Sequence, residues 1–364
     1  METNEINLSN LLKDTVDSKA TDLHLSVGAK PKVRINGNIQ DLKDYDILTQ
    51  TVVTNLCYSI LTEKQKRTFE STKELDFSFS QRGISRFRGN LYYNRGSITG
   101  VFRVIPHEIR RLENLGLPKK VNELIFAQKG LILVTGTTGS GKTTSLAAMI
   151  QAINEKMYKN IITVEDPIEY VFPHINSLVN QREVGEDTDS FGNALRHILR
   201  EDPDVVLIGE IRDLETMRAA LSISETGHLT FGTLHTNSAT QTISRILDMF
   251  PSEEQAEIKT SLSLSLLAII SQSLVHAKNS QDRVLASELL VMNSAIRNLI
   301  REGKMAQIYS QIVGNSGQGM QTMNQCLAEL VDQDLIDRDE AELVSEDKQE
   351  LISLIDSGIK RTQF

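Results

Sequence analysis

The residues best suited to chemistry lie in one glycine-rich stretch, 131–144, with the sequence LILVTGTTGSGKTT. Its apolar start predicts a buried parallel strand. The glycines then allow the backbone to curl until successive N–H groups face one anion. The helix-forming residues that follow predict a helix whose N-terminus faces the same anion. The stretch matches the phosphate-binding pattern GxxxxGK[ST], in which the lysine approaches the terminal phosphates and the next hydroxyl reaches Mg²⁺. It predicts that a nucleotide contacts Gly136, Thr137, Thr138, Gly139, Ser140, Gly141, Lys142, Thr143 and Thr144.

An accidental match is the alternative interpretation of this loop. Such a pattern arises by chance in about one chain in a hundred of this length. Its position between a predicted strand and a predicted helix favours the nucleotide site. Hydrolysis would need more: a carboxylate near the γ-phosphate, an acid on the metal side and a group that senses the γ-phosphate.

Acidic residues at the ends of two predicted strands are candidates for the first two roles. The strand IITVED ends in Glu165 and Asp166, and Glu210 follows the apolar run of DVVLIGE. We expect Glu165 to orient or deprotonate the attacking water, and Glu210, with Asp166 and Thr143, to serve the metal. The opposite assignment of the two glutamates stays open, because Gly209 occupies the position where many P-loop ATPases carry an aspartate. Acids at strand ends are also often helix caps or solvated loop residues.

Histidines bracket a third predicted strand, HLTFGTLH. A neutral imidazole at His235, where this strand ends, could contact the γ-phosphate, and we assign His235 to the site. For His228, at the start of the strand, a core histidine bonded to backbone is an equally good interpretation.

Arginines gather along two predicted strands of the first hundred residues. A guanidinium group is well suited to a bidentate grip on phosphate, so these side chains are candidates for contact with the nucleotide. A solvated strand face would give the same pattern. The four residues are Arg86, Arg88, Arg95 and Arg103.

The elements that must position these residues divide the chain into two domains. Residues 1–104 combine helical spacing at 4–16 and 49–70 with short alternating runs, which predicts a small α+β domain with an antiparallel sheet. Residues 105–117 are charged and irregular and are interpreted as a linker. From 118 to 364, strands first alternate with helices, as in an α/β P-loop core whose parallel sheet is covered on both faces. After residue 256 we expect helices, including a buried helix at 262–275, with LASELLVM as one candidate strand.

Composition limits the kinds of protein that this chain can be. The formal net charge of −9 argues against a nucleic-acid machine, because binding to phosphate backbones needs a surplus of basic residues. Cys57 and Cys326 are far apart and lack CxxC spacing, so we expect free thiols rather than a disulfide or zinc site. The N-terminus lacks a signal peptide, and the most apolar run is shorter than a bilayer, so we expect a cytoplasmic protein without a transmembrane segment.

Four segments in this order resemble the Walker A, Asp, Walker B and His boxes of the secretion ATPases: GTTGSGKT, ITVEDPIEY, REDPDVVLIGEIRD and ETGHLTFGTLHT. The resemblance extends through ATDLHLSVGAKPKVRINGNI near the start and GMQT near the end, so it covers nearly the whole chain. Within these ATPases, SAIRNLIREGK is similar to the signature of the pilus retraction motors, the PilT family. Helical spacing in that segment predicts one apolar stripe, made of Ala295, Ile296, Leu299 and Ile300, and an opposite face for a partner.

The resemblance implies a motor protein. It implies a RecA-like core with a PAS-like N-terminal domain, ATP and Mg²⁺ as cofactors, and a homohexamer that couples ATP hydrolysis to pilus retraction and twitching motility. The motor would act on an inner-membrane pilus platform protein, as a peripheral protein at the pilus base. The alternatives are an accessory paralogue of the retraction motor, a related pilus or secretion ATPase, and a nucleotide-gated scaffold without useful turnover. Net charge opposes a nucleic-acid translocase.

Overall fold

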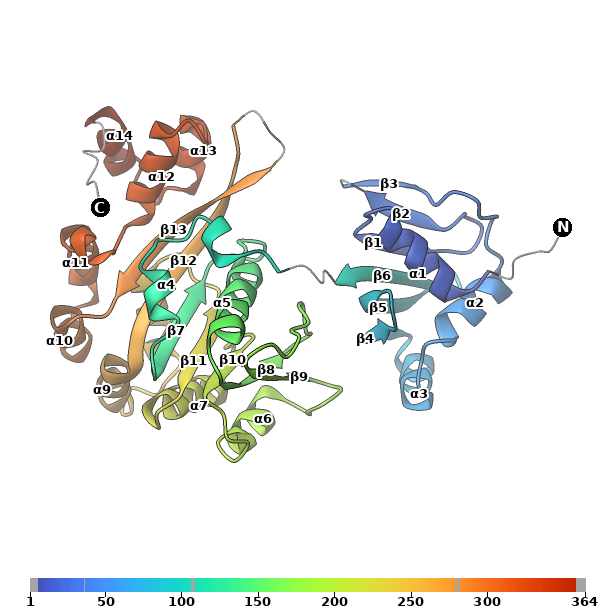
Figure 1. Cartoon of the computed structure of the whole chain (residues 1–364), viewed down its shortest axis with the longest axis horizontal. Coiled ribbons are helices and arrows are strands. Elements are labelled where there is room, and N and C mark those ends of the chain that lie inside the picture. Colours follow the sequence, from blue (N-terminus) through green and yellow to red (C-terminus); the bar gives the residue numbers. More distant parts are fainter. Residues whose placement is uncertain (1–5, 36, 106–108, 279, 281, 358–364) are drawn as a thin grey trace. The chain divides into compact units, whose positions relative to one another are not determined.

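The computed structural model describes residues 6–35, 37–105, 109–278, 280 and 282–357, and these form two compact units (Figure 1). The units are Met1–Glu108 and Ile109–Phe364. The division falls inside the predicted linker 105–117, of which residues 106–108 lie outside the described part. Leu112 packs in the core of the second unit, so the chain from Ile109 onward belongs to that unit. No helix in the described part is long and apolar enough to cross a membrane.

The first unit is built on a six-stranded antiparallel sheet in the order β3-β2-β1-β6-β5-β4. Its strands are β1 (Asp22–Leu25), β2 (Lys32–Ile35), β3 (Asn38–Asp41), β4 (Glu74–Gln81), β5 (Ser85–Asn94) and β6 (Ser97–Ile105). Its helices are α1 (Leu8–Asp17), α2 (Gln50–Tyr58) and α3 (Glu63–Thr72). The predicted helix at 49–70 is therefore two helices, because Thr62 forms a capping box with Gln65 that begins a new one. The predicted α+β class with an antiparallel sheet is confirmed.

The second unit contains a seven-stranded sheet in the order β13-β12-β7-β11-β10-β8-β9. The strands from β12 to β9 in this order are parallel, and β13 runs antiparallel to β12. Their bounds are β7 (Gly130–Thr135), β8 (Asn160–Glu165), β9 (Leu178–Glu183), β10 (Val205–Ile208), β11 (Leu229–Leu234), β12 (Leu266–His276) and β13 (Arg283–Val291). Alternate residues of β7 enter two separate cores, Leu131 and Leu133 on one face and Ile132 and Val134 on the other.

Helices cover both faces of this sheet, as the α/β pattern predicts (Figure 1). Helix α4 (Val121–Leu124) precedes the first strand, and α5 (Lys142–Lys156), α6 (Phe191–Ile198), α7 (Leu214–Glu225), α8 (Ala239–Asp248) and α9 (Gln255–Ser265) lie between strands in the sequence. The helical C-terminal region comprises α10 (Ser294–Glu302), α11 (Ile308–Gly314), α12 (Met323–Asp332), α13 (Arg338–Val344) and α14 (Lys348–Ser357). Short 3₁₀ turns lie at Leu112–Asn114, Met305–Gln307 and Ser316–Gln318.

The predicted buried helix at 262–275 is wrong. Helix α9 ends at Ser265, and the next eleven residues form β12, which pairs with both β7 and β13. A strand covered on both faces is apolar on both sides, so periodicity does not separate it from a buried helix. The candidate strand LASELLVM is confirmed as most of β13.

Candidate functional site

The phosphate-binding loop connects β7 to α5 and has a backbone shape that only glycine tolerates at its start. Gly136 has φ of 144°, and a Cβ atom there would lie 2.4 Å from the carbonyl oxygen of Gln272. Helix α5 begins at Lys142, and none of the described side chains caps it. The N–H groups of the first helical turn have no partners within the helix, so they are available to a phosphate.

Lys142 is folded back onto this loop. Its Nζ donates to the carbonyl oxygens of Gly136 (2.7 Å) and Thr137 (2.9 Å). Burial lowers the pKa of Lys142, although Glu210 and Glu169 oppose that change. Phosphate oxygens are stronger acceptors than carbonyls, so a nucleotide can replace these two contacts.

Hydroxyl groups complete the loop. Ser140 is buried, and its Oγ has no partner among the described residues. Thr144 Oγ1 lies 3.1 Å from the hydroxyl of Tyr170, whereas Thr143 is partly exposed at the first turn of α5. An unpartnered buried hydroxyl beside free N–H groups fits a loop built to hold an anion.

Glu165 ends β8 and is only 6% exposed. Its Oε1 accepts hydrogen bonds from Thr163 Oγ1 (2.6 Å) and Gln181 Nε2 (3.1 Å). Burial nevertheless raises its pKa above the ordinary value for a glutamate. A positioned carboxylate with a raised pKa is a stronger base than an ordinary glutamate.

The structure explains why glycine precedes Glu210. A Cβ atom on Gly209 would lie 3.2 Å from both the Cα of Glu165 and the carbonyl oxygen of Val164. A side chain at this position would therefore press on the backbone at the end of β8, which favours glycine here.

Glu210 follows β10 and binds two cationic or potentially cationic groups. Its Oε2 lies 2.7 Å from Arg212 Nη2, and its Oε1 lies 3.1 Å from His235 Nε2. The hydrogen bond from Arg212 is the largest cause of the lowered pKa of Glu210. Glu210 is thus held ionised, and the structure brings it together with His235. We did not predict Arg212, although its place in GEIRD, two residues after Glu210, was a signal.

The remaining histidine lies at the other end of the same strand. His228 precedes β11, and its Nδ1 is 3.0 Å from the carbonyl oxygen of Ile223. The structural interpretation of His228 therefore holds, and of these two histidines His235 is the one that follows the carboxyl end of β11.

A magnesium ion would find few protein ligands here. No group of three or more His, Cys, Asp or Glu side chains that could hold a metal occurs in the part of the chain that the structure describes. Mg²⁺ usually keeps several waters and takes one or two protein oxygens in addition to substrate phosphates. The hydroxyl of Thr143, exposed Asp166 and Glu210 fit that kind of donor set.

Three of the four predicted arginines share a face of the first unit's sheet. Arg88 is paired with Arg103 across β5 and β6, and Arg86 lies two residues from Arg88. Arg95 is apart from them, in the turn between the two strands, with φ of 51°. The structure brings the first three together and leaves Arg95 elsewhere.

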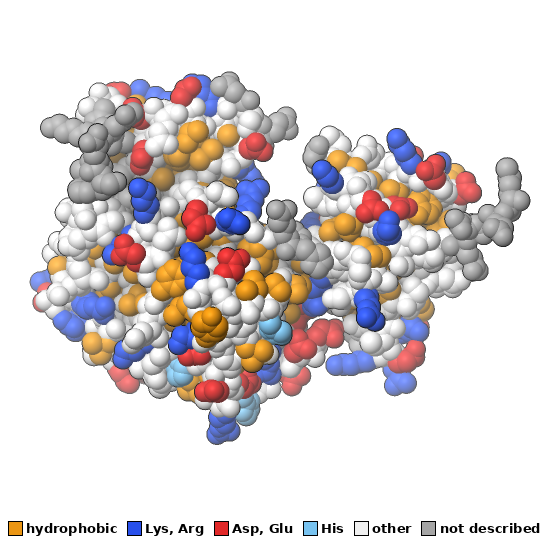
Figure 2. All heavy atoms as spheres, in the orientation of Figure 1, with side chains coloured by type: hydrophobic (Ala, Val, Ile, Leu, Met, Phe, Trp, Pro, Cys, Tyr) orange, Lys and Arg blue, Asp and Glu red, His pale blue; other side chains and the backbone are white. Residues whose placement is uncertain are grey.

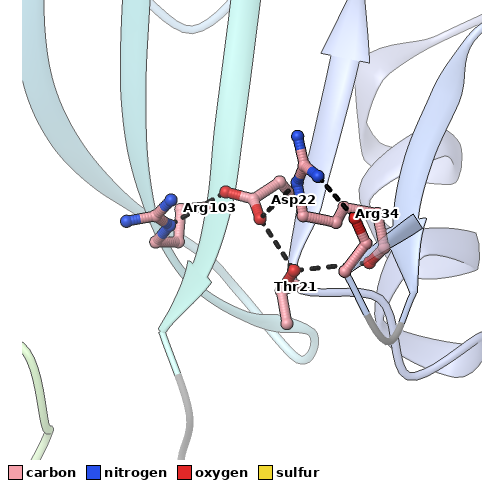
Figure 3. A network of polar contacts seen from close by, with 5 residues as sticks. Thr21, Asp22, Arg34 and Arg103 are labelled. Carbon is pink, nitrogen blue, oxygen red and sulfur yellow. Dashed lines mark hydrogen bonds and ion pairs between the residues drawn. The ribbon is translucent and has the colours of Figure 1, made fainter. Parts of the chain in front are cut away.

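Contacts within the first unit orient these guanidinium groups, and Figure 3 shows those of Arg103 with Asp22. Arg103 Nε donates to Asp22 Oδ1 at 2.8 Å, and Arg34 approaches the other oxygen at 3.9 Å. Burial opposes ionisation of Asp22, but hydrogen bonds from Thr21 and Arg103 hold its pKa below the usual value. Arg86 donates to Ser78 Oγ, and Arg88 lies 3.9 Å from Asp76.

The predicted apolar stripe of SAIRNLIREGK is partly wrong. Ile296 and Ile300 are fully buried in the second unit's core, with Leu299 packed against it, but Ala295 is exposed. Arg297 donates to the carbonyl oxygens of Ser263 and Leu264, at the end of α9. This arginine therefore fixes α10 to its own chain.

A polar pair on β12 lies behind the phosphate-binding loop and was also missed. Ser271 Oγ is 2.9 Å from Thr135 Oγ1, and Gln272 Nε2 donates to Ser145 Oγ of α5 at 2.7 Å. The signal was visible as polar residues that interrupt an apolar run, but the run was interpreted as a helix.

Comparison with known proteins places this geometry among secretion ATPases. Residues 5–342 match the family of Type II/IV secretion system proteins. The Type IV pilus retractation ATPase PilT of Pseudomonas aeruginosa is 46% identical over 336 residues, 92% of this chain and 97% of the relative. A twitching motility protein of Neisseria gonorrhoeae is 44% identical over 306 residues, 84% of this chain and 82% of the relative. The crystal structure of the pilus retraction motor PilT with bound ADP superposes with a TM-score of 0.91 at 50% identity, covering 96% of this chain and 100% of that one.

Proposed function

We propose, because this chain belongs to the Type II/IV secretion system protein family, that its P-loop site hydrolyses ATP and that the reaction drives pilus retraction. The chain is a PilT-like pilus retraction ATPase of the kind that supports twitching motility, by similarity along nearly its whole length. It is a nucleotide-binding protein by its likeness to a retraction motor crystallised with ADP. We propose below a separate role in hydrolysis for each residue of the site.

The observation that carries the proposed mechanism is the alignment of four parallel strands. In-register pairing of β7, β11, β10 and β8 brings their carboxyl ends to one edge of the sheet. The phosphate-binding loop, His235, Glu210 and Glu165 follow these strands in that order. Open α/β sheets bind ligands at this edge.

We assign each residue a defined task, and Glu210 has two. The N–H groups of the loop and Lys142 hold the phosphates and offset their charge. Glu165 orients the attacking water and accepts its proton, which the raised pKa supports. Glu210 and His235 form one hydrogen-bonded pair that contacts the γ-phosphate side, with Arg212 holding the carboxylate. Mg²⁺ arriving with ATP would offset charge on the phosphate oxygens, held by Thr143, Asp166 and Glu210.

We propose that six copies assemble into a ring that acts on a membrane platform protein. Assembly as a homohexamer at the cytoplasmic face of the inner membrane would let Arg86, Arg88, Arg95 or Arg103 of one copy act on the nucleotide of its neighbour. Nucleic acid is disfavoured by the net charge of −9, and acidic and basic side chains are interspersed on the visible surface (Figure 2).

Purified protein tests the enzyme against the scaffold alternative. We expect wild type to release phosphate from ATP continuously, and Lys142→Ala to lose turnover and most of its affinity for ATP, because the buried cation of the loop is removed. Binding of a fluorescent ATP analogue and phosphate release measure the two effects. An affinity of Lys142→Ala within a few-fold of wild type would refute the assignment of the loop. Tight binding by wild type without turnover would support the scaffold.

A further inference from the structure

The loop that carries His235 is bonded to the first turn of α8. Thr236 Oγ1 lies 2.7 Å from Thr242 Oγ1, one turn into that helix. Ser238 caps the helix by accepting from the N–H of Gln241. A displacement of this first turn therefore moves the backbone that positions His235 beside Glu210.

A buried carboxylate of β13 holds the same turn from the other side. Glu288 is 3% exposed, and its Oε1 accepts the N–H of Ala239, the first residue of α8, at 2.7 Å. It also receives a hydrogen bond from the backbone of Met323, the first residue of α12. One carboxylate thus serves the N-termini of two helices, where an anion is electrostatically favoured.

Two more carboxylates, Glu346 in the bend before α14 and Glu350 in the first turn of α14, bond α8 and α12. Gln241 Nε2 donates to Glu346 Oε1 at 3.0 Å, and Asn324 Nδ2 donates to Glu350 Oε2 at 2.6 Å. The titratable groups that face Glu288 are Glu346, Glu350 and Tyr309, whose hydroxyl donates to Glu350. The C-terminal region is therefore bonded to the first turn of α8 as well as packed on the sheet.

We propose that Glu288 is a positioning residue for ATP hydrolysis, which holds α8 against α12 and thereby fixes His235 beside Glu210. This inference rests on the ATPase activity proposed above. It predicts an effect on turnover rather than on nucleotide affinity, because Glu288 touches neither the phosphate-binding loop nor Glu165.

Ionisation of Glu288 should make its effect on ATP turnover depend on pH. Burial is the main cause that raises the pKa of Glu288 to about 7, against the two backbone hydrogen bonds and with the help of the neighbouring carboxylates. The ionised form can accept both helix N–H groups, whereas protonation occupies one oxygen. The contribution of Glu288 to kcat should therefore increase as pH rises through this range.

Two substitutions of Glu288 test this role against a purely structural one. Steady-state ATP turnover is measured between pH 6 and 8, with melting temperature and hexamer size, for wild type, Glu288→Ala and Glu288→Gln.

We expect Glu288→Ala to lower kcat about five- to tenfold with KM for ATP changed less than twofold, the scale seen for residues that couple sites without touching ligand. Glu288→Gln keeps an acceptor and should restore most of kcat at pH 6, with a ratio of wild-type to variant kcat that grows toward pH 8. Asp339→Asn, an exposed carboxylate of α13, is the matched control and should leave kcat unchanged.

The outcomes separate cleanly. A folded Glu288→Ala with wild-type kcat, or a ratio of wild-type to Glu288→Gln kcat that is constant with pH, overturns the inference. If Glu288→Ala does not fold, the pH dependence of the Gln variant alone decides. Glu346→Gln, which alters an exposed contact of α8, should lower kcat about twofold at unchanged melting temperature. A wild-type protein without turnover would instead contradict the proposed function.

Discussion

Glu165 and Glu210 follow neighbouring parallel strands, but their surroundings shift their pKa values in opposite directions. Burial raises the pKa of Glu165, whereas Arg212 lowers that of Glu210. Pairs of carboxylates whose environments separate their pKa values commonly divide acid–base and electrostatic roles. This difference favours Glu165 as the base and Glu210 as the charged partner of the metal and His235.

Replacing each glutamate by glutamine tests that division. We expect both variants to keep ATP binding and to lose hydrolysis by roughly two orders of magnitude, the scale of a removed base or preorganised charge. Because Glu165 must lose its proton to act, wild-type kcat should fall as pH drops through its raised pKa, and Glu165→Gln should lack that acid limb. Normal turnover in both variants would place the catalytic carboxylate elsewhere.

Gly209 offers a test that leaves every charged group in place. A methyl group there would press on the backbone of Glu165 and Val164 at 3.2 Å, so Gly209→Ala should displace the base. We expect kcat to fall about tenfold with little change in ATP affinity, because misplacement of a reacting group by about 1 Å can cost a hundredfold. The matched control is Gly314→Ala, where a Cβ atom meets nothing within 4 Å. Equal kcat for Gly209→Ala and wild type would contradict the close packing.

The phosphate-binding loop lies between β7 and α5, where its sequence pattern predicts it, and its contacts with a nucleotide stay a prediction. The contacts of Gln272 and Gln181 were not predicted, since Gln272 of β12 bonds Ser145 of α5, 127 residues away, and Gln181 lies on β9, a strand that was not expected. Glu288 was missed because its partners on α8 and α12 become neighbours only when the sheet order is known, whereas Arg212 was missed although its partner Glu210 is two residues away.

Among the elements, α10 carries the segment SAIRNLIREGK, and its apolar residues pack in the core of the second unit. Ile296 is fully buried and belongs to the same core as β7, so it cannot face a partner. We therefore expect Ile296→Asn to lower the melting temperature and to lose ATP turnover and retraction together, since removing such a side chain costs about 2–5 kcal/mol before the polar group is counted. Glu302→Gln, on the exposed side of α10, should keep both the melting temperature and turnover. A folded Ile296→Asn that hydrolyses ATP normally but fails to retract pili would contradict this structural role and assign Ile296 to coupling with a partner.

Strand β12 shows where element prediction from sequence reaches its limit. The alternating and parallel patterns predicted the antiparallel sheet and β7, β8, β10 and β11, but β12 was taken for a helix and β9 was not expected. Both β12 faces are covered by helices, so its sequence carries no alternation to distinguish a strand.

At the scale of the whole molecule, the account predicts that one copy is an incomplete enzyme. If first-unit arginines act on a neighbour's nucleotide, specific activity should rise with protein concentration as copies associate. At least one of Arg86, Arg88, Arg95 and Arg103 should lower turnover when changed to alanine, while the hexamer still forms. Dilution series with mass measurement on the same samples provide the readout. Constant specific activity in a protein shown to be monomeric would contradict action between copies.

Twitching of the chain's own host cells tests the central claim most directly. The gene is deleted, surface pili are counted, and wild type or Glu165→Gln is expressed at equal levels in the deletion strain. The account predicts piliated cells that do not spread, with spreading restored by wild type and not by Glu165→Gln. Piliated deletion cells that spread as fast as the parent would contradict it.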